Sequence, residues 1–353
     1  MEEKSLAGLQ MGSGEGLKFI RSLDDRGGIK SEYLVRYEEE ESEYGVYPWK
    51  RPIRSHIEYG VINLDKPPGP TSHEVTAWVK RMLNVSKAGH AGTLDPGVSG
   101  VLPIALEKAT RIIGIVTHTY KEYITLMQLH GKVEYDRLLK VISMFVGEIY
   151  QKPPLRSSVK RAVRKRKIHD IEVLEVDGRK ILMRVRTDPG TYIRKLCHDI
   201  GLILGVGAHM RELRRIAAGS FKEDDTLVTL HKLSEAIYLF KNGDENLLRK
   251  VILPVEYMVS HLPKVIVRNS AVGSIAHGAM LAVPGIAMVD RSVKRGSLVA
   301  VLTVKGELVA VGIAEMSGEE MIFRDKGVAV RIKRVIMPPG VYPDVWKRLK
   351  KSM

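Results

Sequence analysis

The segment from Gly89 to Pro103 places the strictest limits on the backbone, because its 15 residues include four glycines and two prolines. Glycines allow tight turns and let a ligand approach the backbone closely. Pro96 restricts its own φ and favours an extended conformation for Asp95. Asp95 is thus a single carboxylate held stiffly on a loop just before an apolar strand. As a dipeptide, Asp95-Pro96 would indicate an ordinary turn. The whole loop instead favours a nucleophile or general base.

The chain is long enough for two domains, with 353 residues of which 44% are hydrophobic. No stretch approaches the roughly 20 apolar residues of a membrane-spanning helix. The first residues, Met1–Lys4, lack the basic region and apolar core of a signal peptide, so we expect a cytoplasmic protein. The single cysteine, Cys197, excludes an internal disulfide and a cysteine-rich zinc site within one chain.

Net charge indicates a polyanionic partner. The chain carries a formal charge of +15. Residues 1–44 contain six Lys or Arg and eleven Asp or Glu, so the remainder carries about +20. Such an excess favours RNA or DNA through counterion release. An anionic membrane surface is a weaker alternative, because no basic amphipathic helix stands apart from the core pattern.

Composition changes along the chain predict four regions. Residues 1–45 are rich in Gly, Ser and Glu and are interpreted as a weakly ordered acidic arm. Residues 46–253 predict a mixed α+β domain with a mainly antiparallel sheet. Residues 254–343 predict a small β-rich domain, a barrel or sandwich by its strand spacing. Residues 344–353 form a short basic tail.

Local signals predict several elements of the larger domain. Thr71 and Glu74 form the pattern of a capping box at the start of a helix. Asp177-Gly178 predicts a hairpin between strands 168–176 and 180–185. The remaining predictions are strands at 61–64 and 123–129 and helices at 136–145 and 191–204. In the second domain, strands are expected at 265–267, 280–283, 297–303, 308–314 and 328–334.

Four residues besides Asp95 are candidates for chemistry. Arg194 is expected in the first turn of its helix, where a cation opposes the helix dipole. Pairing with a buried carboxylate would explain it, and a carboxylate beside a guanidinium stays ionised. An exposed surface arginine is the equally weighted alternative. Tyr123 and Tyr192 could contact a base, although packing is the more common role of such tyrosines. Leu213, in a basic run, is more often a core residue than a substrate wall.

The segment 152–167 holds eight basic residues, and the whole chain is also positively charged. We interpret it as a phosphate-contacting segment rather than a merely solvated one. The sequence lacks a P-loop, a dinucleotide-binding fingerprint and a metal-binding pattern of histidines. Paired carboxylates of the glycosidase kind are also missing near Asp95. We therefore expect Asp95 to act without a metal or an organic cofactor.

Three segments, 64–72, 89–106 and 190–194, resemble in order and separation the signature segments of TruB-type RNA pseudouridine synthases. Residues 153–161 resemble a fourth segment, and the similarity covers about residues 46–343. Within that family the chain most resembles the archaeal dyskerin-like catalytic subunit of box H/ACA ribonucleoproteins. The second domain resembles a PUA domain. Residues 1–44 do not resemble the usual start of the family.

The resemblance implies roles for individual residues. Asp95 matches the catalytic aspartate, Tyr123 the tyrosine that stacks on the target base, and Arg194 the arginine paired with the aspartate. In the substrate pocket, Leu213 matches an apolar wall, Tyr192 a packing residue and His90 a loop residue near the extruded nucleotide. RNA contacts are expected from Lys66, Arg156, Lys160 and Arg161.

The resemblance also implies a reaction and partners. A uridine leaves its stack, its C1′–N1 bond breaks, and the ring is rejoined through C5. The expected partners are a guide RNA, a ribosomal or transfer RNA substrate and small protein subunits. Two alternatives stay open: the same chemistry on transfer RNA without a guide, and a non-catalytic RNA scaffold in ribosome assembly.

Overall fold

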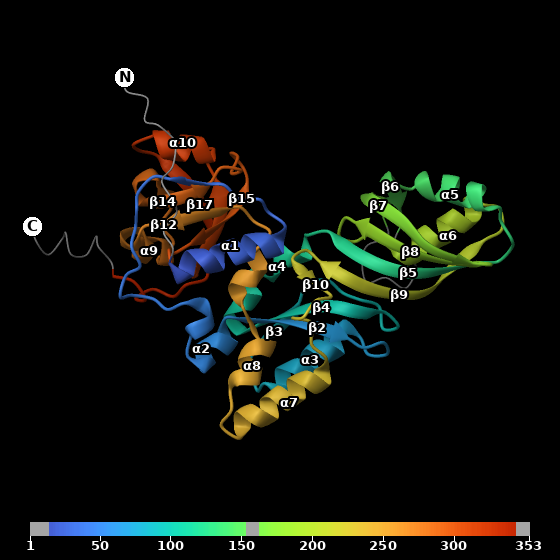
Figure 1. Cartoon of the computed structure of the whole chain (residues 1–353), viewed down its shortest axis with the longest axis horizontal. Helices are drawn as coiled ribbons and strands as arrows, with labels where there is room; N and C mark the ends of the chain where they lie inside the picture. The colour runs from blue at the N-terminus through green and yellow to red at the C-terminus, as the bar shows by residue number, and fades with distance from the viewer. Residues whose placement is uncertain (1–13, 153–161, 344–353) are drawn as a thin grey trace, which may run out of the picture. The chain divides into compact units, whose positions relative to one another are not determined.

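The computed structural model describes residues 14–152 and 162–343 (Figure 1). The chain divides into two compact units. The central unit comprises Ile62–Leu106 and Ile113–Ile252. The terminal unit comprises the residues up to Val61, the stretch Glu107–Ile112 and the residues from Leu253 onward. Both units combine helices with a mainly antiparallel sheet, which confirms the α+β class expected from the sequence.

One curved sheet organises the central unit. In spatial order its strands are β2 (Gly60–Lys66), β4 (Ser99–Leu106), β9 (Ala208–Ala218), β5 (Lys121–Leu129), β8 (Lys180–Thr187), β7 (Arg164–Asp177) and β6 (Gly147–Gln151). β4 and β9 are parallel, whereas the pairs from β9 through β5, β8 and β7 to β6 are antiparallel. The short strand β3 (Ala88–His90) pairs with β4, and β10 (Phe221–Lys222) pairs with β9.

The predicted hairpin is present between β7 and β8. Asp177 pairs with Lys180, which leaves a loop of Gly178 and Arg179. Gly178 has φ +58°, a left-handed conformation that favours glycine. The hairpin signal was reliable because this turn depends on residues adjacent in the sequence.

Helices α5 (Tyr135–Ser143) and α6 (Ile193–Ile203) pack on this sheet, α6 against β9 and β5 and α5 against β7 (Figure 1). The face of α6 that packs inward includes Leu196, Cys197 and Ile200, as its spacing predicted. The predicted capping box of Thr71 and Glu74 is present at the start of α3. The other helices of this unit are α3 (Ser72–Met82), α4 (Ile113–Thr117), α7 (Leu230–Lys241) and α8 (Asn246–Val251).

A seven-stranded sheet forms the centre of the terminal unit. Its apolar side chains, including Val265, Val299 and Val330, make one buried core. The strand order is β1 (Tyr33–Val35), β14 (Ile286–Asp290), β12 (Lys264–Val267), β15 (Leu298–Leu302), β16 (Leu308–Ala314), β17 (Val328–Val335) and β13 (Leu281–Ala282). The other elements include α1 (Glu15–Gly27), η1 (Pro48–Lys50), α2 (Ile53–Glu58), η2 (Glu107–Ile112), β11 (Leu253–Pro254), η3 (Val255–Val259), α9 (Asn269–Ala276), η4 (Val283–Gly285) and α10 (Gly318–Phe323).

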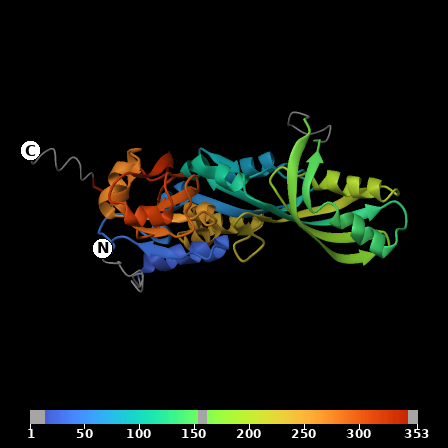
Figure 2. The same ribbon diagram turned by 90° about the horizontal axis from the view of Figure 1, so that it is seen from above.

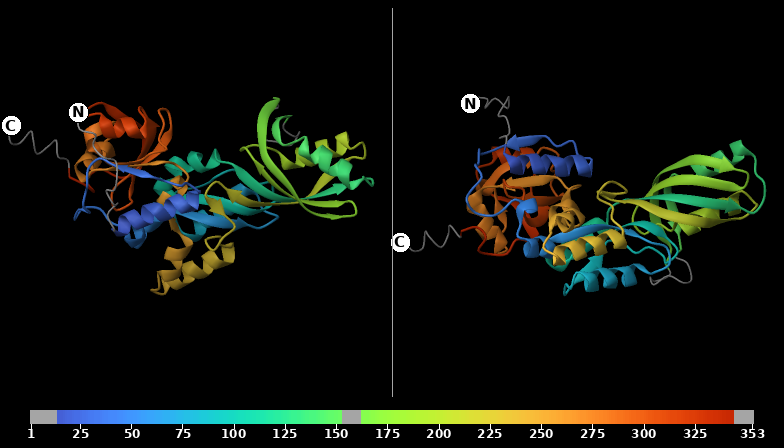
Figure 3. Two further views of the ribbon diagram at one scale, coloured as in Figure 1. Left: turned by 45° about the horizontal axis from the view of Figure 1, so that its top comes forward. Right: turned by 60° about the horizontal axis from the view of Figure 1, so that its bottom comes forward.

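The expectation of a weakly ordered arm over residues 1–45 is wrong for residues 14–45. Helix α1 buries Leu17, Ile20 and Leu23, and β1 pairs with β14. The helix is drawn in blue in Figures 2 and 3. Gly16 lies so close to the chain at Val304 that an added Cβ would come within 2.2 Å of its carbonyl oxygen. The apolar spacing was hidden among Gly and Glu residues, and the strand acquires its partner only from residues about 250 positions away. Residues 1–13 and the tail 344–353 lie outside the described residues.

Within the described ranges, every helix is too short or too polar to cross a membrane.

Candidate active site

Asp95 lies on the loop that joins β3 to β4 in the central unit. The peptide N–H of Val98 donates to the carbonyl of Asp95, which closes a tight turn around Pro96. The side chain of Asp95 is 54% exposed, so the carboxylate is open to a ligand. It is not the buried carboxylate that the sequence suggested as the partner of Arg194.

Two buried side chains from outside the loop hold its backbone on either side of Asp95. The hydroxyl of Ser72 accepts from the N–H of Leu94 at 2.8 Å and donates to its carbonyl at 3.0 Å. The ammonium of Lys66 donates to the carbonyls of Pro96 at 3.0 Å and Val98 at 2.8 Å. Both side chains are fully buried, so their positions are set by packing. The carboxylate of Asp95 is exposed, yet its backbone is rigidly held.

A third buried side chain binds the backbone before and after Asp95. Arg215, on β9, donates from Nε to the carbonyl of Val101 at 2.8 Å and from a terminal nitrogen to the carbonyl of Gly92 at 3.0 Å. Gly92 has φ +89°, a conformation that favours glycine. The loop is therefore fastened to β9 as well as to β2 and α3.

Helix α6 brings Arg194 to Asp95. The guanidinium of Arg194 donates to Oδ2 of Asp95, although the two residues are 99 positions apart. Tyr192 is the N-cap of this helix. The buried side-chain amide of Gln151 accepts from its N–H at 2.9 Å and donates to its carbonyl at 3.1 Å. Gln151 thus fixes the beginning of α6, and the helix fixes the direction of the guanidinium.

Tyr123 and Leu213 share one face of the sheet. Tyr123 lies opposite Arg215 and Thr125 lies opposite Leu213 across β5 and β9. Alternate residues of a strand point to the same face, so Tyr123, Thr125 and Leu213 project together. Thr125 approaches Cys197 of α6, which identifies this as the face that α6 covers. Tyr123 is 9% exposed and Leu213 is half-buried.

His90 ends β3 next to the Asp95 loop. Its ring meets that of His73 edge-on, with 4.9 Å between ring centroids. Burial, with the charges of His73 and Arg215, lowers the pKa of His90 to about 4. The imidazole is therefore neutral near pH 7, and it can exchange hydrogen bonds with a ligand without adding charge.

The expected RNA contact of Lys66 is contradicted by its burial. Its side chain has no exposed surface and its ammonium donates to three carbonyls, those of Pro67, Pro96 and Val98. Burial lowers the pKa of Lys66, the charge of Asp95 opposes this change, and Arg215 reinforces it. A lysine in a basic protein resembles a phosphate contact in sequence, and only packing showed that it faces inward. Arg156, Lys160 and Arg161 lie outside the described residues.

Sequence reasoning missed three positioning groups, Ser72, Gln151 and Arg215. Ser72 directly follows the capping residue Thr71, and Arg215 belongs to the basic run that contains Leu213. Neither position carries a local signal of burial. Their partners lie 22 to 123 residues away, so the contacts exist only in the folded chain.

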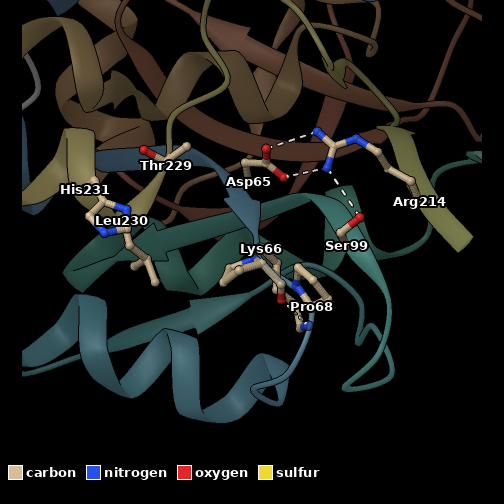
Figure 4. Close-up of a pocket in the computed structure, with 9 residues that line it drawn as sticks. Asp65, Lys66, Pro68, Ser99, Arg214, Thr229, Leu230 and His231 are labelled. Atoms are coloured by element: carbon tan, nitrogen blue, oxygen red, sulfur yellow. Dashed lines mark hydrogen bonds and ion pairs between the residues drawn. The ribbon is translucent and has the colours of Figure 1, made fainter.

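A separate hollow of about 330 Å³ lies beside the end of β2 (Figure 4). Arg214 forms one wall and donates to both carboxylate oxygens of Asp65, at 2.9 and 3.0 Å. Adjacent strand residues point to opposite faces of a sheet. Arg214 therefore lines this hollow, whereas Arg215 binds the loop that carries Asp95. The described lining residues are Asp65, Lys66, Pro67, Pro68, Ser99, Arg214, Thr229, Leu230 and His231, so this hollow does not include Asp95, Tyr123 or Arg194.

Among the residues that the structure describes, no cluster of three or more His, Cys, Asp or Glu side chains could hold a metal ion. The arrangement of Asp95, Arg194 and the tyrosines is suited to covalent or acid–base chemistry by one carboxylate.

Comparison with known proteins identifies the family. The model for the TruB family pseudouridylate synthase (N terminal domain) matches residues 80–193, and the tRNA pseudouridylate synthase B C-terminal domain matches residues 194–260. A protein of Pyrococcus furiosus named probable tRNA pseudouridine synthase B is 56% identical over 327 residues, which cover 92% of this chain and 96% of that protein. The chain belongs to the TruB family of pseudouridylate synthases. It is a pseudouridine synthase.

Other relatives of this TruB-family enzyme match nearly the whole chain. A protein of Methanopyrus kandleri with the same name is 55% identical over 309 residues, covering 87% of this chain and 91% of that protein. A subunit in the crystal structure of a Cbf5-Nop10-Gar1 complex superposes with a TM-score of 0.85 at 56% identity, covering 90% of this chain and 98% of that one. A chain in a structure of H/ACA RNP bound to a substrate RNA containing 2′-deoxyuridine superposes equally well, with 54% identity and coverages of 91% and 99%.

Two further family models match the ends of this TruB-family chain. The PUA domain matches residues 263–336, which confirms the resemblance noted for the second domain. The DKCLD (NUC011) domain matches residues 29–76. Residues 29–44, which did not resemble the usual start of the family in the sequence analysis, thus belong to a segment that matches a known domain.

Lys66→Met tests the burial of this lysine. We expect the single-turnover rate of pseudouridine formation to fall about 10²-fold, because the loop loses two bonds beside Asp95 and a 1 Å displacement costs that much. RNA affinity should be unchanged, because Lys66 has no exposed surface. Rapid quenching and filter binding measure the two quantities. Lys80→Met, at an exposed position of α3, is the control with no expected effect. A loss of affinity rather than rate would contradict the positioning role.

Proposed function

We propose that this chain is the catalytic subunit of a box H/ACA ribonucleoprotein, in which a guide RNA selects uridines of ribosomal RNA for conversion to pseudouridine, with Asp95 as the catalytic carboxylate. The observation that carries the proposal is the ion pair of Asp95 and Arg194 on a backbone fixed by Ser72, Lys66 and Arg215. The proposed partners follow from the superposed chains, whose complexes contain Nop10, Gar1 and a substrate RNA.

The reaction assigns a task to each group. A target uridine turned out of its stack would meet Tyr123 on one side, with Leu213, Tyr192 and His90 around it. The carboxylate of Asp95 acts on the sugar or the base while the C1′–N1 bond breaks. The ring then turns, C1′ bonds to C5, the proton leaves C5 and N1 gains a proton. Arg194 fixes the carboxylate and offsets its charge through each step.

RNA binding is assigned to the basic segment 152–167 and the PUA domain. On β7, Lys165 and Lys167 are exposed, whereas Arg166 donates to the carbonyl of Gly190, just before α6. Arg156, Lys160 and Arg161 belong to the same proposal. The positive charge of this segment provides sequence-independent attraction, and the guide provides the choice of uridine. Such RNA substrates agree with the cytoplasmic location expected from the sequence.

A second function is favoured by the curated names, which describe relatives as probable tRNA pseudouridine synthase B. In this alternative the enzyme modifies transfer RNA without a guide. The chemistry of Asp95 is the same, and only the source of specificity differs.

Reconstitution separates the two functions. Purified chain would be incubated with an rRNA fragment, with and without a complementary guide RNA, Nop10 and Gar1, and separately with unmodified transfer RNA. Carbodiimide labelling followed by primer extension locates pseudouridine. We expect modification of the rRNA fragment only with the matching guide, and none with a mismatched guide. Equally rapid guide-free modification of transfer RNA would favour the alternative. No pseudouridine in any arrangement would refute the proposed function.

A further inference from the structure

Arg215 is a fully buried cation whose known contacts are unusual. Its side chain is 1% exposed. Within the described ranges its hydrogen bonds go to the carbonyls of Val101 and Gly92. Tyr123 lies directly opposite Arg215 across β5 and β9. Burial lowers the pKa of Arg215, and the side chain of Tyr123 opposes that change. None of these groups is a carboxylate. Removing a guanidinium from water costs free energy. We infer that the contacts which the side chain makes in the interior offset this cost.

The two hydrogen-bond partners of Arg215 and its cross-strand neighbour come from three different parts of the central unit. Val101 lies on β4, Gly92 belongs to the loop that carries Asp95, and Tyr123 lies on β5 directly opposite Arg215. The planar guanidinium presents its donors in fixed directions, which lets one side chain hold the carbonyls of Val101 and Gly92 while it lies beside Tyr123. Lys121, the neighbouring buried cation, is occupied elsewhere, because its ammonium donates to the carbonyls of residues 116, 117 and 119.

We propose that Arg215 is a positioning residue that keeps the ring of Tyr123 in fixed register with the loop that carries Asp95. The inference rests on the proposed function, in which Tyr123 receives the target base and Asp95 reacts with the nucleotide. It adds that these two groups are coupled through one guanidinium. A displacement of either group relative to the other would then slow the reaction without lowering the affinity for RNA.

Arg215→Lys is the first test. Lysine keeps the positive charge but replaces the fork with a single point donor, so it cannot hold the carbonyls of Val101 and Gly92 in the same geometry beside Tyr123. We expect the single-turnover rate to fall about 10²-fold with RNA affinity unchanged. Arg211→Lys, at an exposed position on the same strand, is the matched control and should behave as wild type.

Coupling is measured with Tyr123→Phe, which removes only the hydroxyl. If Arg215 acts partly through that hydroxyl, the double variant should lose much less activity than the product of the two single losses. Independent, multiplicative losses would contradict the coupling. Should Arg215→Lys fail to fold, Tyr123→Phe alone decides: a wild-type rate would overturn the proposal.

Hydrogen exchange provides a readout that does not depend on activity. Arg215→Lys should speed exchange of the amides of residues 91–94, and Arg211→Lys should not. Unchanged exchange in Arg215→Lys would overturn the inference whether or not the wild-type chain makes pseudouridine. An inactive wild-type complex with faster exchange in Arg215→Lys would instead count against the proposed function alone.

Discussion

Asp95→Asn is expected to abolish pseudouridine formation, with a loss of at least about 10⁴-fold in the single-turnover rate. Asparagine has nearly the same shape as aspartate, so the loop held by Ser72, Lys66 and Arg215 should keep its conformation. The change removes the negative charge and one carboxylate oxygen, and it removes the ion-pair partner of Arg194. RNA affinity should be retained, because the positive charge of the chain is not reduced.

The measurement compares pseudouridine formation and RNA binding in the same reconstituted complex. Asp170→Asn, which changes an exposed carboxylate of β7, is the matched control and should remain fully active. An Asp95→Asn variant within tenfold of the wild-type rate would refute the catalytic role of Asp95. Loss of RNA binding together with activity would favour the interpretation as an RNA scaffold.

Glu256→Ala is expected to destabilise the terminal unit by about 3–5 kcal/mol, the usual cost of leaving a buried ion without its partner. Glu256 is fully buried, and its carboxylate accepts both terminal nitrogens of Arg51, at 2.6 and 3.0 Å. It also accepts from the N–H of Leu308 at 2.9 Å. Alanine would remove the carboxylate that accepts from the guanidinium of Arg51 and from this N–H.

Urea denaturation followed by circular dichroism would measure the effect. The double variant Arg51→Met/Glu256→Leu removes both charges and should recover most of the lost stability, because apolar side chains can replace a buried pair. Glu15→Ala breaks the exposed ion pair with Lys50 and should change the free energy of unfolding by at most about 1 kcal/mol. Similar effects of Glu256→Ala and Glu15→Ala would contradict the role assigned to the buried pair.

Elements with local causes were predictable from the sequence. The capping box of Thr71 and Glu74 and the turn at Gly178 each depend on residues within four positions of one another. Helix α6 was expected at 191–204 and spans Ile193–Ile203, because its apolar spacing matches the period of a helix. The N-terminal helix was missed because its apolar residues gain a partner surface only in the folded unit.

The pairing of Asp95 with Arg194 was predictable from the sequence, but the exposure of the pair was not. The glycines and prolines around Asp95 indicated a stiff loop, and the first-turn position of Arg194 indicated a carboxylate partner. The structure brings Asp95 and Arg194 together, although both are about half exposed. Lys66 was expected to face RNA and instead holds the loop from within.

By itself, the sequence determined the local features of this protein. These are one carboxylate on a restrained loop, a large excess of cations, and helices and strands whose signals are local. Tertiary structure alone decided which cations face solvent and which hold carbonyls in the interior. Lysine and arginine carry the same charge in either place. Only the packing of distant strands removes water from Lys66 and Arg215 and gives them backbone oxygens to bind.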